Sequence, residues 1–291
     1  MTKSKSVLSA LLVMLLWGSL FSFVKLGYGA YNIVATGDIL FFAGVRFLVC
    51  GAAICIFSFI RNKKSFLPVK SAIIPVLCAG LFSIVLHYAF TYLGLSLTDS
   101  SKTAILKQIG ILFYVCFSWL FFRDDCVTAK KIIGAVLGFA GIVAINAGEG
   151  GISFSIGDAL IIVASFCTVA ANIISKRVFK TVEPIVSTGV SQLFGGIVLL
   201  VAGTLFGGKM SFAFDFSSLI MVYICIASIF SYCIWFTVVK NGELSKLFII
   251  KFAEPVFAAV FGALLLGENI FRPQYAISFL LIAAGICISN K

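Results

Sequence analysis

The sequence predicts an all-α integral membrane protein with ten transmembrane helices, arranged as two inverted five-helix repeats. Three observations predict this class. The 291 residues are 61% hydrophobic and only 11% charged, whereas soluble domains carry about 25% charged residues. Apolar runs of roughly 18 or more residues, long enough to span a bilayer, recur along the whole chain. The second half of the sequence also repeats the first half in register.

Ten helices follow from these runs and from the polar breaks between them. We expect them over residues 6–25, 37–60, 71–95, 99–121, 129–147, 156–178, 183–206, 216–239, 245–266 and 273–289. Pro184 and Pro273 stand at helix starts, where the N–H that proline lacks has no helical partner. The first run follows Lys3 and Lys5 as a signal peptide would. However, it is long, contains Trp17 and has no small-x-small cleavage site, so we interpret it as the first membrane helix.

The internal repeat has an offset of 144 residues. The stretch 101–107 (SKTAILK) returns as 245–251 (SKLFIIK), and the same gapless register pairs Tyr88 with Tyr232. We therefore expect two halves of nearly equal length, residues 1–147 and 148–291, with five helices each. Because five is an odd number, the two repeats insert with opposite polarity. This inverted architecture recurs in secondary transporters, which bind their substrate near the membrane midplane.

The distribution of Lys and Arg predicts the orientation in the membrane. If the N-terminus is cytoplasmic, most basic residues fall on the cytoplasmic side, and the opposite side holds only Lys102, Lys209 and Arg272. This asymmetry follows the positive-inside rule, so we expect a plasma-membrane (inner-membrane) protein with both termini in the cytoplasm. Loop charges also account for the net charge of +11, and we expect no nucleic-acid partner.

Two lysines occupy equivalent places inside the fourth and ninth helices. Lys107 and Lys251 each lie one to two turns inside an apolar run, where a charge is costly. Glu254 lies three residues after Lys251, a spacing that permits an ion pair, and Pro255 lacks the N–H that the Lys251 carbonyl would accept. We predict that Lys107, Lys251 and Glu254 bind substrate. The alternative is snorkelling, with Lys107 reaching outward and Lys251 inward to the headgroups.

Polar and aromatic stripes on other helices add candidates for substrate contact. Tyr114 follows Lys107 on the same helix face, and Asn172 belongs to a polar stripe on the sixth helix. The full set of candidate substrate-binding residues is Lys107, Lys251, Glu254, Tyr88, Tyr232, His87, Trp17, Trp235, Asn172 and Tyr114. Small polar residues also pack membrane helices together without binding a ligand. For His87, a buried hydrogen-bonded role competes with a proton-linked one.

Two further features have structural alternatives. Arg46 in the second helix is assigned either to a structural role, such as pairing with Asp38, or to substrate binding. Gly134-x-x-x-Gly138 in the fifth helix and Ala283-Ala284-Gly285 in the tenth are close-packing surfaces. They indicate either packing within the chain or a homodimer through these helices.

Several short features recur in a fixed order along the chain: Trp17-Gly18-Ser19, Arg46, Glu254-Pro255, Gly267-Glu268 and a last helix that contains glycine. Together they resemble the EamA-like family of the drug/metabolite transporter superfamily. The resemblance covers essentially the whole chain as two family repeats. The first repeat departs from the pattern, because Gly110-Ile111 stand where Glu-Pro is expected and Asp124 stands where the second repeat has Glu268. The resemblance implies ten helices around a central cavity, lined by the first, third, fourth, sixth, eighth and ninth helices, with the fifth and tenth at the periphery.

We predict a secondary transporter that moves a small polar organic metabolite across the cytoplasmic membrane by alternating access. Its substrate is expected to be amino-acid-like or to bear a carboxylate or phosphate. One alternative is an exporter of cationic or amphipathic drugs or of other metabolites. Another, from a different class, is a channel or a non-transporting membrane receptor.

The sequence favours no enzymatic role. The chain has one histidine and shows neither an H-E-x-x-H motif nor a nucleophile–base spacing. We therefore predict no catalytic or metal-binding residues and no cofactor. A nucleotide-binding P-loop is absent from the sequence, so we do not expect this chain to drive transport directly with ATP. The expected partners are the small-molecule substrate and membrane lipids.

Overall fold

The regular elements that the structure describes are all helical. The computed structural model describes residues 3–95, 97, 106–145, 154–210, 216–267 and 273–290, and no strand occurs in these ranges. The α-helices are α1 (Lys3–Ala30), α2 (Thr36–Arg61), α3 (Leu67–Ser71), α4 (Ile73–Gly80), α5 (His87–Leu95), α7 (Ile109–Phe117), α8 (Ala129–Ile145), α9 (Ile156–Val178), α10 (Pro184–Leu205), α11 (Phe216–Asn241), α12 (Leu244–Ile250), α13 (Ala253–Leu266) and α14 (Pro273–Asn290). They are joined in places by the 3-10 segments η1 (Lys63–Phe66) and η3 (Ser118–Leu120) and by the π-helical segment η2 (Leu81–Leu86).

Eight helical stretches among the described residues are long and apolar enough to cross a membrane. They are Lys5–Ala30, Thr36–Arg61, Ile73–Gly94, Ile156–Val178, Pro184–Leu205, Ser218–Asn241, Leu244–Leu266 and Pro273–Asn290. Two further predicted spans appear as shorter helices. The helix α8 has 17 residues. The span predicted over 99–121 is represented by Ile109–Leu120, and its predicted start lies outside the described residues. The prediction of an all-helical multi-pass membrane protein is therefore confirmed.

Two predicted continuous helices are interrupted. The helix expected over 71–95 consists of α4, η2 and α5, because the chain widens into a π-helical segment just before His87. The helix expected over 245–266 breaks between α12 and α13. The other expected boundaries that fall on described residues agree within a few positions, and 156–178 coincides with α9.

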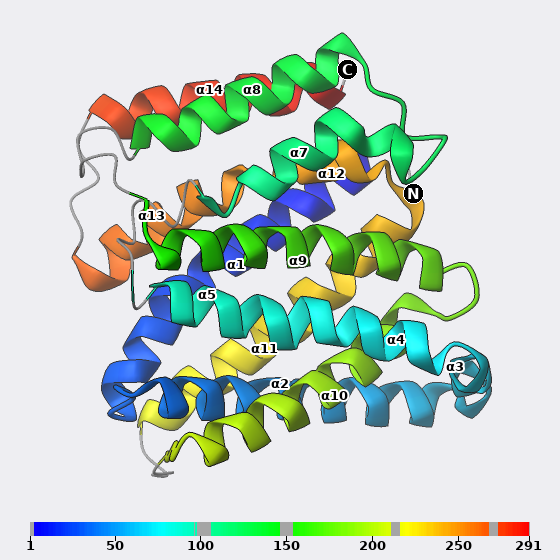
Figure 1. Cartoon of the computed structure of the whole chain (residues 1–291), viewed down its shortest axis with the longest axis vertical. Coiled ribbons are helices and arrows are strands. Elements are labelled where there is room, and N and C mark those ends of the chain that lie inside the picture. Colours follow the sequence, from blue (N-terminus) through cyan, green and yellow to red (C-terminus); the bar gives the residue numbers. More distant parts are fainter. Residues whose placement is uncertain are drawn as a thin grey trace. The chain divides into compact units, whose positions relative to one another are not determined.

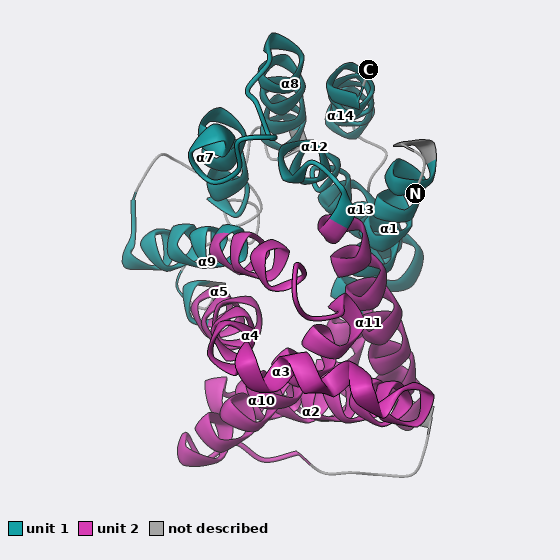
Figure 2. Cartoon of the chain, turned by 90° about the vertical axis from the view of Figure 1, so that its right-hand side faces the viewer, with its two compact units in different colours: residues 1–22, 93–169, 241–291 teal, residues 23–92, 170–240 magenta. Residues whose placement is uncertain are grey.

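One of the two compact units combines residues 1–22, 93–169 and 241–291 (Figure 2). In this unit α8 and α14 lie side by side (Figure 1). A Cβ built at Gly134 would lie 2.7 Å from the carbonyl oxygen of Gly285, and one at Gly141 would lie 3.1 Å from that of Ser278. The two glycine-bearing surfaces that the sequence indicates therefore pack against each other within the chain.

The other unit, residues 23–92 and 170–240, is built on the packing of α2 against α10. Glycines recur every seven residues on both helices: Gly37, Gly44 and Gly51 on α2, and Gly189, Gly196 and Gly203 on α10. A Cβ at Gly44 would lie 2.5 Å from the backbone nitrogen of Leu200, and one at Gly196 would lie closer still to that of Leu48. Side chains cannot occupy such positions, so the glycine repeat permits direct backbone contact between the two helices.

Candidate functional site

Both repeats interrupt a helix at the equivalent lysine. The chain makes a turn at Lys107 and Gln108 before α7, and another at Lys251 and Phe252 between α12 and α13. The two turns are 144 residues apart and therefore occupy the same repeat position. Lys251 lies seven residues after Leu244, the start of α12, which corresponds to about 10 Å along a helix axis.

Proline chemistry accounts for the interruption in the second repeat. Pro255 has no N–H to donate to the carbonyl of Lys251. That carbonyl instead accepts a 3.0 Å hydrogen bond from the backbone N–H of Glu254, only three residues ahead. The helix is therefore tightened into a turn at Lys251, whereas the sequence predicted only that the Lys251 carbonyl lacks its usual donor.

In the first repeat a serine on a neighbouring helix supplies the hydrogen bond to the lysine carbonyl. Ser165 Oγ of α9 accepts a 2.9 Å hydrogen bond from the Gly110 N–H and donates a 2.6 Å hydrogen bond to the carbonyl of Lys107. A side chain at Gly110 would clash with Ser165. Glycine at this position therefore lets α9 approach, which gives a physical reason for the departure of Gly110-Ile111 from the Glu-Pro of the second repeat.

One face of α1 lies against both lysines. The Lys251 ammonium is 4.9 Å from the centroid of the Trp17 ring, and the Lys107 ammonium is 5.4 Å from that of the Phe21 ring. Trp17 and Phe21 are four residues apart, about one helical turn, so the two ammonium groups lie at neighbouring levels. A side chain at Gly18, between these rings, would clash with the backbone of α13. Glycine here brings α1 close enough to contact the lysines.

A carboxylate completes this group, which we call the lysine centre: Lys107, Lys251, Glu254, Trp17 and Phe21. Glu254 attracts both ammonium groups, and the two lysines repel each other. With all three groups ionised, the centre carries one net positive charge. Lys107, Lys251 and Glu254 are only half-buried, although they belong to apolar helices. The lysine centre therefore brings two ammonium groups and one carboxylate together within a membrane-spanning region.

Tyr114 belongs to a different group in the same unit. It is fully buried, and its hydroxyl donates a 3.1 Å hydrogen bond to Asp125. The Asp125 carboxylate also accepts hydrogen bonds from Lys131 Nζ (2.8 Å), from the Ser245 N–H (3.0 Å) and from the Ser245 hydroxyl. Lys131 Nζ in turn lies 3.0 Å from the Glu243 carboxylate. This Asp125 cluster (Tyr114, Asp125, Lys131, Glu243 and Ser245) joins α7, α8 and α12.

Sequence reasoning did not find the Asp125 cluster. The predicted orientation places Lys131 among the basic residues on the cytoplasmic side, yet only 3% of its side chain is exposed. The burial of Lys131 could have been predicted from helical periodicity. Lys131, Gly134 and Gly138 lie at positions i, i+3 and i+7 and therefore share one face of α8. That face packs inward. Asp125 has no comparable signal, since it lies in a connection without helical periodicity.

Further candidates gather around Arg46 in the other unit. Arg46 is 4% exposed, and its Nε donates a 2.9 Å hydrogen bond to Ser228 Oγ. The hydroxyl oxygens of Tyr88 and Tyr232, which are repeat equivalents, lie 3.2 Å apart. The Phe47 ring packs on both tyrosines, with centroid distances of 4.8 and 6.0 Å. Arg46 therefore lies in a buried aromatic group that includes both predicted tyrosines.

The alternative pairing of Arg46 with Asp38 does not occur among the described contacts. The Asp38 carboxylate instead accepts hydrogen bonds from the backbone N–H groups of Ala35 (3.1 Å) and Lys209 (2.8 Å). Burial and hydrogen bonding to Ser228 thus favour a structural contribution of Arg46 to this unit.

The three remaining candidates lie in the same unit as Arg46. His87 begins α5 directly after η2, and its ring is edge-on to that of Tyr88, with centroids 5.1 Å apart. Trp235 Nε1 donates a 2.8 Å hydrogen bond to Asn172 Oδ1, and both side chains are buried. Lys102, Glu268 and Arg272, which entered the sequence analysis, lie outside the described residues.

Comparison with known proteins decides the family. The model of the EamA-like transporter family matches residues 4–147 and, a second time, residues 155–291. The chain belongs to this family. It is a multi-pass membrane transporter of the drug/metabolite transporter superfamily, as the sequence motifs indicate.

EamA-like relatives match along most of their length. The uncharacterized transporter YvbV of Bacillus subtilis is 26% identical, over 99% of this chain and 92% of the relative. The uncharacterized inner membrane transporter YedA of Escherichia coli is 24% identical, over 94% of this chain and 87% of the relative. One crystal structure shares the fold with a TM-score of 0.79 at 20% identity, covering 98% of this chain and 96% of that one.

The EamA-like motif in the first helix has a visible structural basis. Trp17 packs under the Lys251 ammonium, Gly18 permits the contact with α13, and the Ser19 hydroxyl donates a 2.8 Å hydrogen bond to the Leu16 carbonyl. The first two residues of the motif thus form one wall of the lysine centre.

Proposed function

We propose that this protein is a secondary transporter that moves a small polar organic metabolite across the cytoplasmic membrane by alternating access. The substrate is amino-acid-like or bears a carboxylate or phosphate. Lys107 and Lys251 bind its anionic group, and Glu254 pairs with an ammonium or takes part in proton coupling. The observation that carries the proposal is the lysine centre, where the ammonium groups of Lys107 and Lys251 pack on two aromatic rings of α1 one turn apart, with the Glu254 carboxylate near enough to attract both.

Electrostatics supports an anionic substrate group. A charge inside a membrane-spanning region is costly and normally serves a function. The Lys251 ammonium packs on the Trp17 ring, and such a cation–π contact stabilises the ammonium at this position. The contact would be lost if the side chain extended to the headgroups. One carboxylate cannot neutralise two ammonium groups, so a bound carboxylate or phosphate restores the balance.

Contacts between repeat equivalents support ten helices in two inverted repeats, residues 1–147 and 148–291. The family model matches the chain twice. Tyr88 contacts Tyr232, its partner at the offset of 144. A second example lies between α8 and α14, where Gly134 contacts Gly285 and Gly141 contacts Ser278. Ser278 is the repeat equivalent of Gly134, and Gly285 is the repeat equivalent of Gly141, so the two contacts are equivalent with the helices exchanged. Such exchange is expected of a pseudo-twofold axis between repeats.

Transport assays distinguish this proposal from its rivals. A thermal-shift screen of the purified protein against metabolites identifies ligands, because a ligand stabilises the state it binds. The best hits are then tested as radiolabelled solutes in proteoliposomes. The proposal predicts saturable uptake of a carboxylate or phosphate compound, with counterflow when the same unlabelled solute is inside.

Each rival predicts a different outcome of these assays. Saturable flux of cations alone, with no anionic substrate, supports the drug exporter. Single-channel currents support a channel. Ligand binding without any flux in correctly inserted protein supports a receptor. The cytoplasmic location of both termini is a separate part of the proposal, tested by protease protection of tags at each end, and a homodimer is tested by light scattering.

A further inference from the structure

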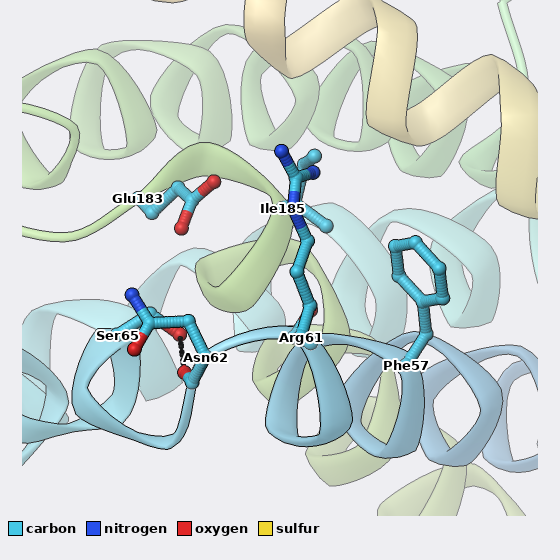
Figure 3. Close-up of a pocket in the computed structure, with 7 residues that line it drawn as sticks. Phe57, Arg61, Asn62, Ser65, Glu183 and Ile185 are labelled. Carbon is cyan, nitrogen blue, oxygen red and sulfur yellow. Dashed lines mark hydrogen bonds between the residues drawn. The ribbon is translucent and has the colours of Figure 1, made fainter.

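A polar cavity lies in the unit of residues 23–92 and 170–240, where α2 ends and α10 begins (Figure 3). This open cavity has a volume of about 140 Å³, whereas a water molecule occupies about 30 Å³ of the liquid. It therefore has room for a small polar group. The lining residues that bear on its chemistry are Phe57, Ser58, Arg61, Asn62, Ser65 and Glu183.

Ser58 lines this cavity, and its hydroxyl is buried and unpaired. Its side chain is 6% exposed, and its Oγ has no hydrogen-bond partner in the part of the chain that the structure describes. Buried hydroxyl groups are nearly always paired. A ligand in the cavity would supply the missing partner once the Ser58 side chain turns toward it.

Two opposite charges border the cavity from different helices. Arg61 is the last residue of α2, and Glu183 directly precedes Pro184 at the start of α10. Within the described ranges these two side chains form no ion pair with each other. Glu183 stands at the N-cap position of α10, but its side chain makes no capping hydrogen bond. The structure thus leaves a guanidinium and a carboxylate for one ligand with two charges.

The loop after α2 adds a fixed acceptor. The Ser65 hydroxyl donates a 2.7 Å hydrogen bond to the Asn62 carbonyl (dashed in Figure 3), which uses its only proton. Its lone pairs therefore remain for a donor group. The cavity combines donors that suit a phosphate, Arg61 and Ser58, with acceptors that suit a primary ammonium, Glu183 and Ser65.

The surroundings favour a lipid as the source of this ligand. Phe57 and Ile60 on the same stretch of α2 are 59% and 78% exposed, as expected of side chains that face acyl chains. Lys63 and Lys64 follow directly, and the proposed orientation places them at the cytoplasmic surface. We propose that this cavity binds the headgroup of phosphatidylethanolamine in the inner leaflet, with the phosphate on Arg61 and Ser58 and the ammonium on Glu183.

Native mass spectrometry of the purified full-length protein tests this site. The protein is delipidated and then incubated with phosphatidylethanolamine, phosphatidylcholine or phosphatidylglycerol of matched acyl chains. We expect phosphatidylethanolamine to bind most tightly, because its ammonium can donate hydrogen bonds to Glu183. Arg61→Gln should weaken that binding by about tenfold or more, as for loss of a charge-assisted hydrogen bond. Lys64→Gln, a nearby exposed change outside the cavity, should not weaken it.

A second variant gives a readout that misfolding cannot imitate. Glu183→Gln should remove the preference for phosphatidylethanolamine over phosphatidylglycerol while leaving phosphatidylglycerol binding at least as strong. Equal binding of all three lipids by the native protein would overturn the proposal. So would unchanged lipid binding in Arg61→Gln, or equally tight binding of phosphoethanolamine without acyl chains. This site is independent of the lysine centre, so failure here leaves the proposed transport function untouched.

Discussion

Replacing Asp125 by Asn is expected to destabilise the folded protein by about 3 kcal/mol. The Asp125 carboxylate accepts hydrogen bonds from Tyr114, from Lys131 and twice from Ser245. Asn keeps the shape but turns one acceptor oxygen into an NH₂ donor that faces other donors. Breaking a buried ion pair costs about 3–5 kcal/mol. We expect the lower end of this range, because Lys131 keeps Glu243 as a partner.

The assay is thermal unfolding of the detergent-solubilised protein. A loss of this size lowers the unfolding midpoint by about 5 °C or more. The adjacent Asp124 is exposed, so Asp124→Asn supplies a matched control that should change stability by about 0.5 kcal/mol or less. In the double variant Asp125→Asn/Lys131→Met the two losses should not add, since the residues share one interaction. Equal midpoints for Asp125→Asn and Asp124→Asn would refute the reasoning.

Three further predictions follow from other contacts. Gly44→Ala should lower the free energy of unfolding by about 1–3 kcal/mol, because the new Cβ would lie 2.5 Å from the α10 backbone. Gly29→Ala is the control and should not destabilise the protein, because no atom lies within 4 Å of its new Cβ. Equal thermal unfolding midpoints for the two variants would contradict this prediction. Ser165→Ala should cost about 1–3 kcal/mol, since it unpairs a backbone N–H and the Lys107 carbonyl; unchanged unfolding in urea would exclude that role. Burial alone would raise the pKa of the Asp125 and Glu243 carboxyl groups, but hydrogen bonds and the charge of Lys131 outweigh it and hold both pKa values below the ordinary range. A carboxyl group whose pKa is lower in the folded than in the unfolded protein stabilises the fold at pH values above its unfolded-state pKa, and this stabilisation is lost as the pH falls through its folded-state pKa. The thermal unfolding midpoint should therefore stay constant from pH 7 to about pH 5 and fall below about pH 4. A midpoint that rises on acidification would contradict this prediction.

The helices themselves were largely predictable from the sequence. Apolar runs of spanning length separated by polar breaks predict their positions, and for α9 the agreement extends to both ends. The π-helical segment η2 was not predictable, because widening a helix depends on packing with neighbours rather than on local residue type. The contact of α2 with α10 has a sequence signal in the glycines spaced by seven on both helices.

The candidate site was predictable only in part. Repeat position and membrane depth singled out Lys107 and Lys251, and the structure brings both to one face of α1. Phe21 was missed, since an aromatic residue in an apolar run has no distinguishing signal. Tyr114 was expected on the same helix face as Lys107, yet its hydroxyl is hydrogen-bonded to Asp125. Helical periodicity predicts which residues share a face, but not which partner a long side chain reaches.

Solute flux in lysine variants tests the central claim most directly. Lys107→Gln and Lys251→Gln are reconstituted in proteoliposomes beside Lys130→Gln, an exposed lysine at the start of α8. Loss of one charged contact to the substrate should lower its apparent affinity by about tenfold to a hundredfold. The proposal predicts this loss in both inner variants and native flux in Lys130→Gln. Native affinity and flux in Lys107→Gln and Lys251→Gln would contradict it.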